Sequence, residues 1–273
     1  MLFPRLITIL IGIPIILYVI YWGGIPFLLF ILGVTTLGLR EYLKFVKKGG
    51  YLTNSIVGQV CGILFLLSIY LNKIEFLAVQ CNQGTAMALS FIILVLFLAE
   101  FFRSELNYAL LRVGITLLGI MLIVWTIGHL ILIREIRPLG MQYTFFLFLV
   151  IWAVDISAYA TGYLFGKHKL YPKISPHKTV EGFLGGIVFG IIIAVIVYLI
   201  LLRKEFTLTE TILLSFFIAI MAQLSDLIES LVKRSVGVKD SSTLLPGHGG
   251  ILDRFDSFIF SAPLFFYYLT LFH

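Results

Sequence analysis

Charged residues are scarce in this sequence. Only 12% of the 273 residues are Asp, Glu, Lys or Arg, whereas 60% are hydrophobic, and the mean hydropathy is +1.07. A water-soluble domain of this size has too little interior to bury so many apolar side chains. The composition therefore excludes a soluble protein and indicates an integral membrane protein. The apolar runs are long and do not alternate with polar residues, which favours an all-α, polytopic protein over a β-barrel.

Cysteine is equally scarce, with only Cys61 and Cys81. They form no CxxC pair and have no histidine nearby, so a disulfide framework and a zinc site are both disfavoured. No Ser–His–Asp or Cys–His arrangement is recognisable. Internal repeats, low-complexity tracts and soluble insertions are also lacking. We therefore expect one membrane domain over residues 1–273, with N-terminal spans in 1–142 and the functional motifs in 143–273.

The apolar runs predict nine transmembrane helices, since about 20 apolar residues cross a bilayer. The first run is not a cleaved signal peptide, because a second run follows it after only Gly23 and Gly24. With nine spans, 15 of the 20 Lys and Arg residues lie on one side, which the positive-inside rule makes cytoplasmic. This places the N-terminus and the two longest polar loops in the cytoplasm. The predicted spans are 6–22, 25–41, 56–71, 85–102, 109–133, 143–165, 182–202, 211–232 and 255–272.

A cluster of cations, Arg40, Lys44, Lys47 and Lys48, follows the second span. We interpret it as a topology anchor that contacts anionic lipid headgroups, with a direct role in substrate binding as the alternative.

Aspartate is absent from the first half of the chain; all five aspartates lie at or after residue 155. Asp155 interrupts a predicted span, where an ionisable group is costly and is a candidate for function. A buried carboxylate paired for packing is the alternative. In the eighth span, Asp226, Glu229, Ser230 and Lys233 follow helical spacing and form one polar stripe. Such a stripe should face the bundle interior or a watery cavity, either for function or for structure alone.

Asp253 and Asp256 lie three residues apart at the expected start of the last span. If residues 253–256 are helical, both carboxylates point the same way and make a platform for Mg²⁺, which prefers oxygen ligands and often bridges to substrate phosphates. Helix capping is the alternative.

Residues suited to binding phosphate surround this acidic pair. Gly247, Gly249 and Gly250 flank His248, and glycines let backbone N–H groups approach an anion. His248 is also compatible with a simple hydrogen-bonded loop residue. In the loop KLYPKISPHKTVEG (169–182), we expect Ser175–Pro176 to begin a short helix. The sequence therefore predicts a site for a metal–polyphosphate where the bilayer meets the cytoplasm. The further candidate residues are Lys233, Arg234, Lys239, Arg254, Lys173, Ser175, Lys178 and Thr179.

The segment SLVKRSVGVKDSSTLLPGHGGILDRFD (230–256) resembles the signature of the phosphatidate cytidylyltransferases, or CDP-diacylglycerol synthases. Asp155, AYATGYLFGK, ISPHKTVEG and Gly185–Gly186 are similar to the upstream region of that family. One departure is Ser225, where many relatives have glycine. The matching signature positions are Ser230, Lys233, Arg234, Lys239, Asp240, Ser242, Leu245, Pro246, His248, Gly249, Gly250, Asp253, Arg254 and Asp256.

The resemblance implies a Mg²⁺-dependent reaction of CTP with phosphatidate, carried out by a homodimer with its site near the cytoplasmic face. The lack of soluble extensions suits an enzyme of a bacterial inner membrane. It implies Asp226 and Asp253 as the main metal ligands, with Asp256 third, and a potassium ion beside the magnesium. Lys233 and Arg254 would act in catalysis. The resemblance also implies Lys233, Arg234, Lys239, His248 and Arg254 as contacts to phosphate or nucleotide. With the residues predicted from the loops and the polar stripe, the expected binding contacts are Ser175, Lys178, Thr179, Ser230, Arg234, Lys239, His248, Gly249 and Gly250.

Other functions fit some of the same features. A CTP-dependent lipid kinase or a phosphotransferase acting on polyprenyl phosphate would also use Mg²⁺, acidic pairs and cations. A CDP-alcohol phosphatidyltransferase is disfavoured because its DGxxAR element is absent. An ion-coupled transporter with Asp155 and Asp226 as coupling residues belongs to another class, but the chain lacks the repeated halves typical of transporters.

Overall fold

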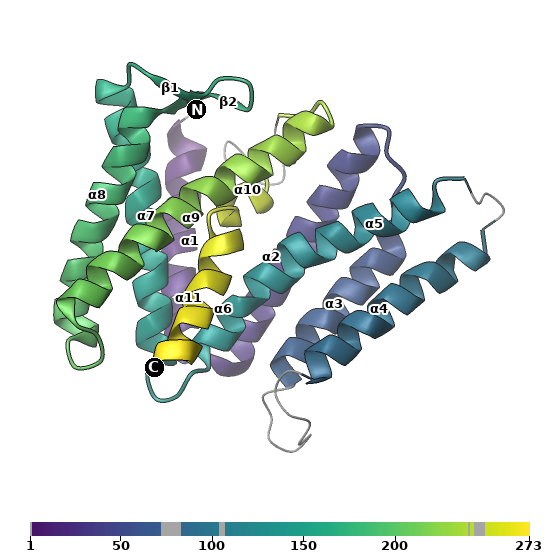
Figure 1. Cartoon of the computed structure of the whole chain (residues 1–273), viewed down its shortest axis with the longest axis horizontal. Coiled ribbons are helices and arrows are strands. Elements are labelled where there is room, and N and C mark those ends of the chain that lie inside the picture. Colours follow the sequence, from purple (N-terminus) through teal and green to yellow (C-terminus); the bar gives the residue numbers. More distant parts are fainter. Residues whose placement is uncertain (1, 72–82, 104–106, 240, 243–248) are drawn as a thin grey trace. The chain divides into compact units, whose positions relative to one another are not determined.

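The computed structural model describes residues 2–71, 83–103, 107–239, 241–242 and 249–273, with side chains from residue 10 onward in α1 and from residue 84 onward in α4. These residues are nearly all helical (Figure 1). The only strands among them are β1 (Lys169–Tyr171) and β2 (Ser175–Thr179), which form an antiparallel hairpin. The helices are α1 (Leu2–Trp22), α2 (Gly24–Lys48), α3 (Ser55–Leu71), α4 (Gln83–Phe101), α5 (Ala109–Gly119), α6 (Thr126–Arg134), α7 (Gly140–Phe165), α8 (Val180–Val197), α9 (Leu208–Ser235), α10 (Leu252–Phe255) and α11 (Phe258–Phe272), with π-helical segments η2 (Ile120–Trp125) and η3 (Tyr198–Leu202).

The helices confirm an all-α, polytopic membrane protein. Seven helical segments in the described part of the chain are long and apolar enough to cross a bilayer. Two shorter apolar helices, Leu10–Trp22 and Ser55–Leu71, correspond to the first and third predicted spans. Every predicted span therefore falls on a helix. The count of nine crossings and the cytoplasmic N-terminus stay predictions.

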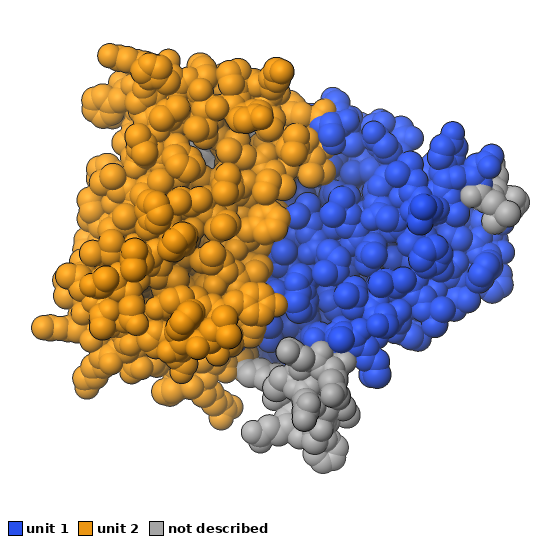
Figure 2. Space-filling model, viewed as in Figure 1, with its two compact units in different colours: residues 1–132, 235–255 blue, residues 133–234, 256–273 orange. Residues whose placement is uncertain are grey.

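The chain forms two compact units (Figure 2). Unit 1 contains Met1–Leu132 and Ser235–Phe255, and unit 2 contains Ile133–Arg234 and Asp256–His273. The segment Ser235–Phe255, which holds most of the signature, thus belongs to the same unit as the N-terminal spans. The boundary between the two units differs from the division at 142/143 that we expected within the membrane domain. That the chain is a single membrane domain stays a prediction.

In unit 1, α2, α3 and the α5–η2 helix pack against one another through small residues. A Cβ on Gly58 would lie 2.5 Å from Thr116, and one on Gly119 would lie 2.5 Å from Tyr42. Glycine at these positions lets the helix backbones approach closely, as is common in membrane bundles.

A buried polar network ties the ends of α3, α4 and α5 together in unit 1. Arg112, which is 1% exposed, donates to Glu100 from both Nε (2.9 Å) and Nη2 (2.6 Å). Glu100 also accepts from Asn54 Nδ2 at 2.7 Å, and Asn54 Oδ1 accepts from Arg103 at 2.7 Å. Each charge in this network has an oppositely charged partner, which is the condition under which burial is tolerated.

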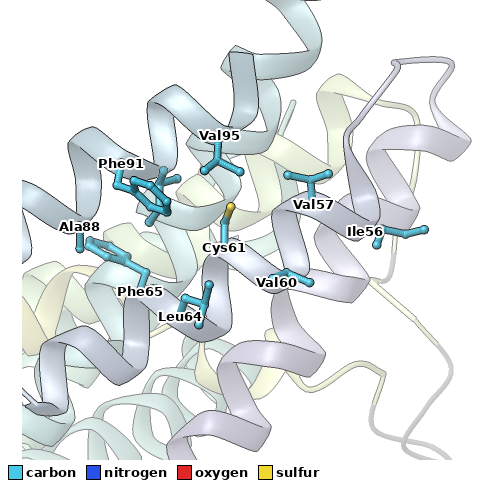
Figure 3. Close-up of a pocket in the computed structure, with 10 residues that line it drawn as sticks. Ile56, Val57, Val60, Cys61, Leu64, Phe65, Ala88, Phe91 and Val95 are labelled. Atoms are coloured by element: carbon cyan, nitrogen blue, oxygen red, sulfur yellow. The ribbon is translucent and has the colours of Figure 1, made fainter. Parts of the chain in front are cut away.

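An apolar groove of about 250 Å³ lies between α3 and α4 (Figure 3). Its lining includes Cys61 and Phe65 of α3 and Phe91 and Val95 of α4. None of its lining residues is charged, so this groove is not suited to a nucleotide.

In unit 2, α7 and α8 pack along a row of glycines. Gly182, Gly186 and Gly190 follow each other at intervals of four on α8, and a Cβ on Gly190 would lie 2.6 Å from Val154 of α7. The third helix, α9, contacts α8 through Gln223, whose Nε2 donates to the carbonyl of Phe183 at 3.2 Å. The N-terminal part of α11 is bound to α9 because Ser225 Oγ accepts from the backbone N–H of Phe260 at 3.0 Å.

The hairpin between α7 and α8 corrects one prediction. Ser175–Pro176 does not begin a helix; it lies in β2, where Ser175 pairs with Tyr171 and Thr179 with Lys169. The helix begins four residues later, because Thr179 Oγ1 caps α8 by accepting from the backbone N–H of Gly182 at 3.1 Å.

Candidate active site

In unit 2, the hairpin meets the C-terminal half of α9. Lys178 Nζ of β2 lies 2.7 Å from Asp226 Oδ2, and their side chains are 25% and 35% exposed. Arg234 near the end of α9 donates from Nε to the carbonyl of Ile174 at 3.3 Å. A predicted metal ligand and two predicted phosphate contacts are thus brought to one end of unit 2. The contact is what we expect if the hairpin loop and the end of the eighth span face the same side.

The predicted polar stripe lies on one continuous helix, α9. Ser230 Oγ donates to Asp226 Oδ1 at 3.5 Å, at the limit of a hydrogen bond, and Lys233 forms an ion pair with Glu229 one turn before it. Glu229 and Lys233 are buried, at 2% and 9% exposure. Lys233 is therefore held within the helix bundle, whereas Arg234 is exposed.

Acidic side chains gather around the start of α11 in unit 2. Asp256 Oδ1 accepts from the backbone N–H of Ser257 at 2.7 Å, and Ser257 Oγ donates to Asp155 Oδ1 at 3.1 Å. Asp155, Asp226 and Glu229 all act electrostatically on Asp256. Negative charges gathered in one place repel one another, and a nearby cation would reduce that repulsion.

In unit 1, the described part of the signature segment folds around Asp253. Its Oδ2 accepts from the backbone N–H of Gly250 at 2.7 Å, from Ser241 Oγ at 3.0 Å and from the Ser241 backbone N–H at 3.3 Å. One carboxylate oxygen thus organises its own loop. The helical stretch α10 ends at Phe255, so Asp256 lies beyond it and the two aspartates have different hydrogen-bond partners.

Glu41 is a site residue that sequence reasoning missed. It lies on α2, is 5% exposed, and accepts hydrogen bonds from four groups of the signature segment. We interpreted the charged end of this helix as a topology anchor and considered only its cations. The available signal was a glutamate within a membrane helix, which is costly unless it is paired or hydrogen-bonded.

The remaining predicted contacts are distributed as follows. Lys239 and Arg254 belong to unit 1 and are exposed, and Gly249 adopts a positive φ of 80°, which favours glycine. Ser175 is partly buried in β2, and Thr179 is buried as the cap of α8. The predicted contact His248 lies outside the described residues, as do the signature positions Asp240, Leu245 and Pro246.

The donor chemistry of the three aspartates fits Mg²⁺. Carboxylate oxygens are its preferred protein ligands, and the ion commonly takes only one or two of them together with waters and substrate phosphates. Among the described residues, no group of three His, Cys, Asp or Glu side chains is arranged to hold a metal ion. Asp226 and Asp256 belong to unit 2 and Asp253 to unit 1. Their joint coordination of one ion stays a prediction.

The fold defines the class of helical, polytopic membrane proteins, and sequence comparison gives the family. The cytidylyltransferase family matches residues 3–272, and the chain belongs to this family. It is 34% identical over 268 residues to the phosphatidate cytidylyltransferase of Bacillus subtilis, covering 98% of this chain and 97% of that protein. The proteins of the same name from Staphylococcus saprophyticus and Staphylococcus epidermidis are 35% and 37% identical, each covering 95% of this chain and 96% of the relative. The resemblance expected from the signature is confirmed.

Proposed function

We propose that this protein is a phosphatidate cytidylyltransferase, which converts CTP and phosphatidate to CDP-diacylglycerol and pyrophosphate in phospholipid biosynthesis. The observation that carries the proposal is the similarity, over nearly the full length of both chains, to relatives of that name. The aspartates and cations of the signature segment supply the chemical groups that this reaction needs.

The reaction needs alignment and charge neutralisation more than a strong base. A phosphate oxygen of phosphatidate attacks the α-phosphorus of CTP, and a new P–O–P bond forms. The bond from the α-phosphorus to the β-phosphate oxygen breaks, and pyrophosphate leaves with the electron pair. Because the nucleophile is already anionic, no proton has to be removed, and the protein's main task is to bring two anions together in line.

In unit 2, Lys178 and Arg234 supply positive charge where a phosphate would bind. Lys178 is held by Asp226, and Arg234 is steadied by the carbonyl of Ile174. Ser230 and the Lys233–Glu229 pair lie on the same helix as Asp226 and Arg234, and their contacts order the polar face of α9. Ser175 and Thr179 shape the hairpin that carries Lys178.

In unit 1, Lys239 and Arg254 are the exposed cations of the signature, and Arg254 follows Asp253 directly. Arg254 would neutralise charge that builds up on the leaving pyrophosphate, since its guanidinium matches phosphate geometry. Gly249 and Gly250 give the loop backbone a close approach to an anion, and His248 is proposed to contact the nucleotide.

Asp226, Asp253 and Asp256 are proposed to hold Mg²⁺, which would polarise the α-phosphate of CTP and stabilise departing pyrophosphate. The potassium ion implied by the resemblance is a further part of the proposal, without assigned ligands. The proposed setting is the bacterial inner membrane, with the site at the cytoplasmic face and the protein as a homodimer. The excess of Lys and Arg on one side supports that orientation.

The test is to follow the label from radioactive CTP into lipid, using purified protein in mixed micelles with phosphatidate and Mg²⁺. We expect label from the α-phosphate in CDP-diacylglycerol and none from the γ-phosphate. Transfer of γ-label would identify a lipid kinase instead. Solute flux in sealed liposomes without any labelled lipid would identify a transporter. Removal of the metal with EDTA should abolish turnover, and added Mg²⁺ should restore it.

The matched variants are Asp226→Asn and Glu210→Gln, both on α9. Glu210 binds Thr207 at the other end of the helix, roughly 24 Å away at about 1.5 Å per residue. Asp226→Asn should lower kcat on the order of 10²-fold or more, because a metal contact contributes mainly in the transition state. Glu210→Gln should stay within about twofold of the unchanged enzyme. Normal turnover by Asp226→Asn would remove this residue from the mechanism.

A further inference from the structure

Glu41 on α2 binds groups of the signature segment that lie 200 to 211 positions away in the sequence. Its Oε1 accepts from Ser242 Oγ at 2.6 Å and from the backbone N–H of Ile251 at 3.1 Å. Its Oε2 accepts from Ser241 Oγ at 3.0 Å and from the backbone N–H of Leu252 at 2.9 Å. Both oxygens are thus occupied by groups of one short segment, and all five residues belong to unit 1.

The four donors lie on both sides of residues 243–248. Ser241 and Ser242 precede these residues, and Ile251 and Leu252 follow them. A single carboxylate, only 5% exposed, therefore fastens two stretches of the signature to one membrane helix. A polar segment at a membrane surface has few apolar groups to bury, so hydrogen bonds to a fixed acceptor are an effective way to order it.

Glu41 and Asp253 share a donor. Ser241 Oγ lies 3.0 Å from Glu41 Oε2 and 3.0 Å from Asp253 Oδ2. The hydroxyl has one proton, so it can donate to only one of the two carboxylates at a time. Asp253 Oδ2 is also held by the backbone N–H groups of Ser241 and Gly250, and Gly250 directly precedes the stretch that Glu41 holds.

Gly250 makes this close arrangement possible. A Cβ at this position would overlap Ser241 Oγ and Glu41 Oε2, and it would lie 2.8 Å from Glu41 Cδ. The packing therefore leaves no room for a side chain between the segment and the carboxylate.

We propose that Glu41 is a positioning residue for the reaction: it fixes the hydroxyls of Ser241 and Ser242 and the backbone at 251–252, and thereby sets the direction in which Asp253 presents its carboxylate. The proposal rests on the function proposed above, in which Asp253 is a metal ligand. In this role Glu41 would touch neither substrate nor metal. The chemical requirement is an acceptor with enough lone pairs for four donors at the length of a glutamate side chain.

The principal test is Glu41→Gln, which keeps the size of the side chain. The amide oxygen can still accept two hydrogen bonds. The amide nitrogen is a donor, so it cannot accept from the hydroxyl and backbone N–H groups that bind the second carboxylate oxygen. We expect hydrogen–deuterium exchange of a peptide covering 249–255 to rise by about tenfold or more, with little change in α3 or α4. Binding of Mn²⁺, as a spectroscopic substitute for Mg²⁺ measured by electron paramagnetic resonance, should weaken by roughly tenfold, and kcat/KM should fall with it.

Two further variants separate positioning from general stability. Glu100→Gln changes a buried carboxylate of the same unit that binds Arg112 and Asn54, so it should lower thermal stability without changing Mn²⁺ affinity or exchange in 249–255. Ser242→Ala removes one donor but keeps the carboxylate. It should raise exchange in the same peptide by a smaller factor, and it provides the test if Glu41→Gln fails to fold.

Unchanged exchange in 249–255 would show that Glu41 does not hold the segment. Raised exchange with unchanged Mn²⁺ affinity and kcat/KM would also overturn the proposal, because the segment would then be held without positioning anything. Asp253→Asn tells the two proposals apart. Normal turnover in Asp253→Asn removes the metal role on which the positioning depends, whereas an inactive Asp253→Asn beside a fully active Glu41→Gln removes the positioning role alone.

Discussion

A methyl group added at Gly250 should disrupt the signature segment more than its size suggests. Ser241 Oγ and Glu41 Oε2 would both overlap the new Cβ and would have to move away, and Glu41 Cδ at 2.8 Å would have to retreat by at least roughly 0.6 Å to reach an ordinary contact of 3.4 Å. Four hydrogen bonds hold that carboxylate in place, so the movement stretches or breaks some of them. Overpacking costs about 1–3 kcal/mol, and losing one hydrogen bond to a charged group costs about 1.5–3 kcal/mol.

Gly250→Ala should therefore destabilise the ordered segment by roughly 3–5 kcal/mol, equivalent to a loss of activity of about 10²-fold to 4 × 10³-fold. The assay is formation of CDP-diacylglycerol by folded protein recovered from gel filtration. Gly33→Ala on α2 is the control, because a Cβ there meets nothing within 4 Å, and alanine generally favours a helix over glycine.

A double-variant cycle separates the clash with Glu41 from direct crowding of a bound phosphate. If the clash acts through Glu41 and the Ser241 hydroxyl that Glu41 holds, Gly250→Ala should cost less in a Glu41→Ala background, because both changes then disrupt the same contacts. Full additivity of the two losses, or activity of Gly250→Ala within about threefold of the unchanged enzyme, would refute the reasoning.

Two further predictions follow from single contacts. Lys178→Met removes the cation 2.7 Å from Asp226 while keeping much of the side-chain length. The kcat/KM for CTP should fall by about tenfold or more, because a charged contact to phosphate is lost. An unchanged kcat/KM would exclude Lys178 from phosphate binding. Glu100→Gln leaves Arg112, which is 1% exposed, without its anionic partner. The free energy of unfolding in detergent should fall by about 3–5 kcal/mol, while turnover of the folded fraction stays normal. An unchanged melting temperature would contradict this account of the network.

The fold was largely predictable because a membrane helix is recognisable in the sequence as a long apolar run. Each long apolar run became a helix, since a chain in lipid must satisfy its own backbone hydrogen bonds. The hairpin was not predictable in the same way. Ser175–Pro176 has the local chemistry of a helix start, but Thr179 offers a competing cap next to Gly182, and strand pairing with Lys169 and Tyr171 extends the chain up to that point. Local capping preference could not decide between these two starts.

The candidate site shows a similar division between local and long-range information. The polar stripe on α9 could be predicted from the spacing of its residues along one helix. In the structure, two of these residues, Lys233 and Glu229, form an ion pair. The contact between Lys178 and Asp226 joins residues 48 positions apart, so no spacing rule predicts it. The hydrogen bonds of Glu41 span 200 to 211 positions, whereas the resemblance concerned only the second half of the chain.

The chemistry of Glu41 nevertheless narrows which residue can occupy its position. An apolar side chain would leave the buried backbone N–H of Leu252 and that of Ile251 without their acceptor, each at a cost of about 1–3 kcal/mol. Aspartate is one methylene shorter and reaches less far from the axis of α2, while glutamine supplies only one accepting atom. The cost of placing this charge among buried residues is offset by its four donors. The signature segment lies about two hundred residues after Glu41 in the sequence. Its need for an acceptor of hydrogen bonds explains why an acidic residue stands near the end of the second span.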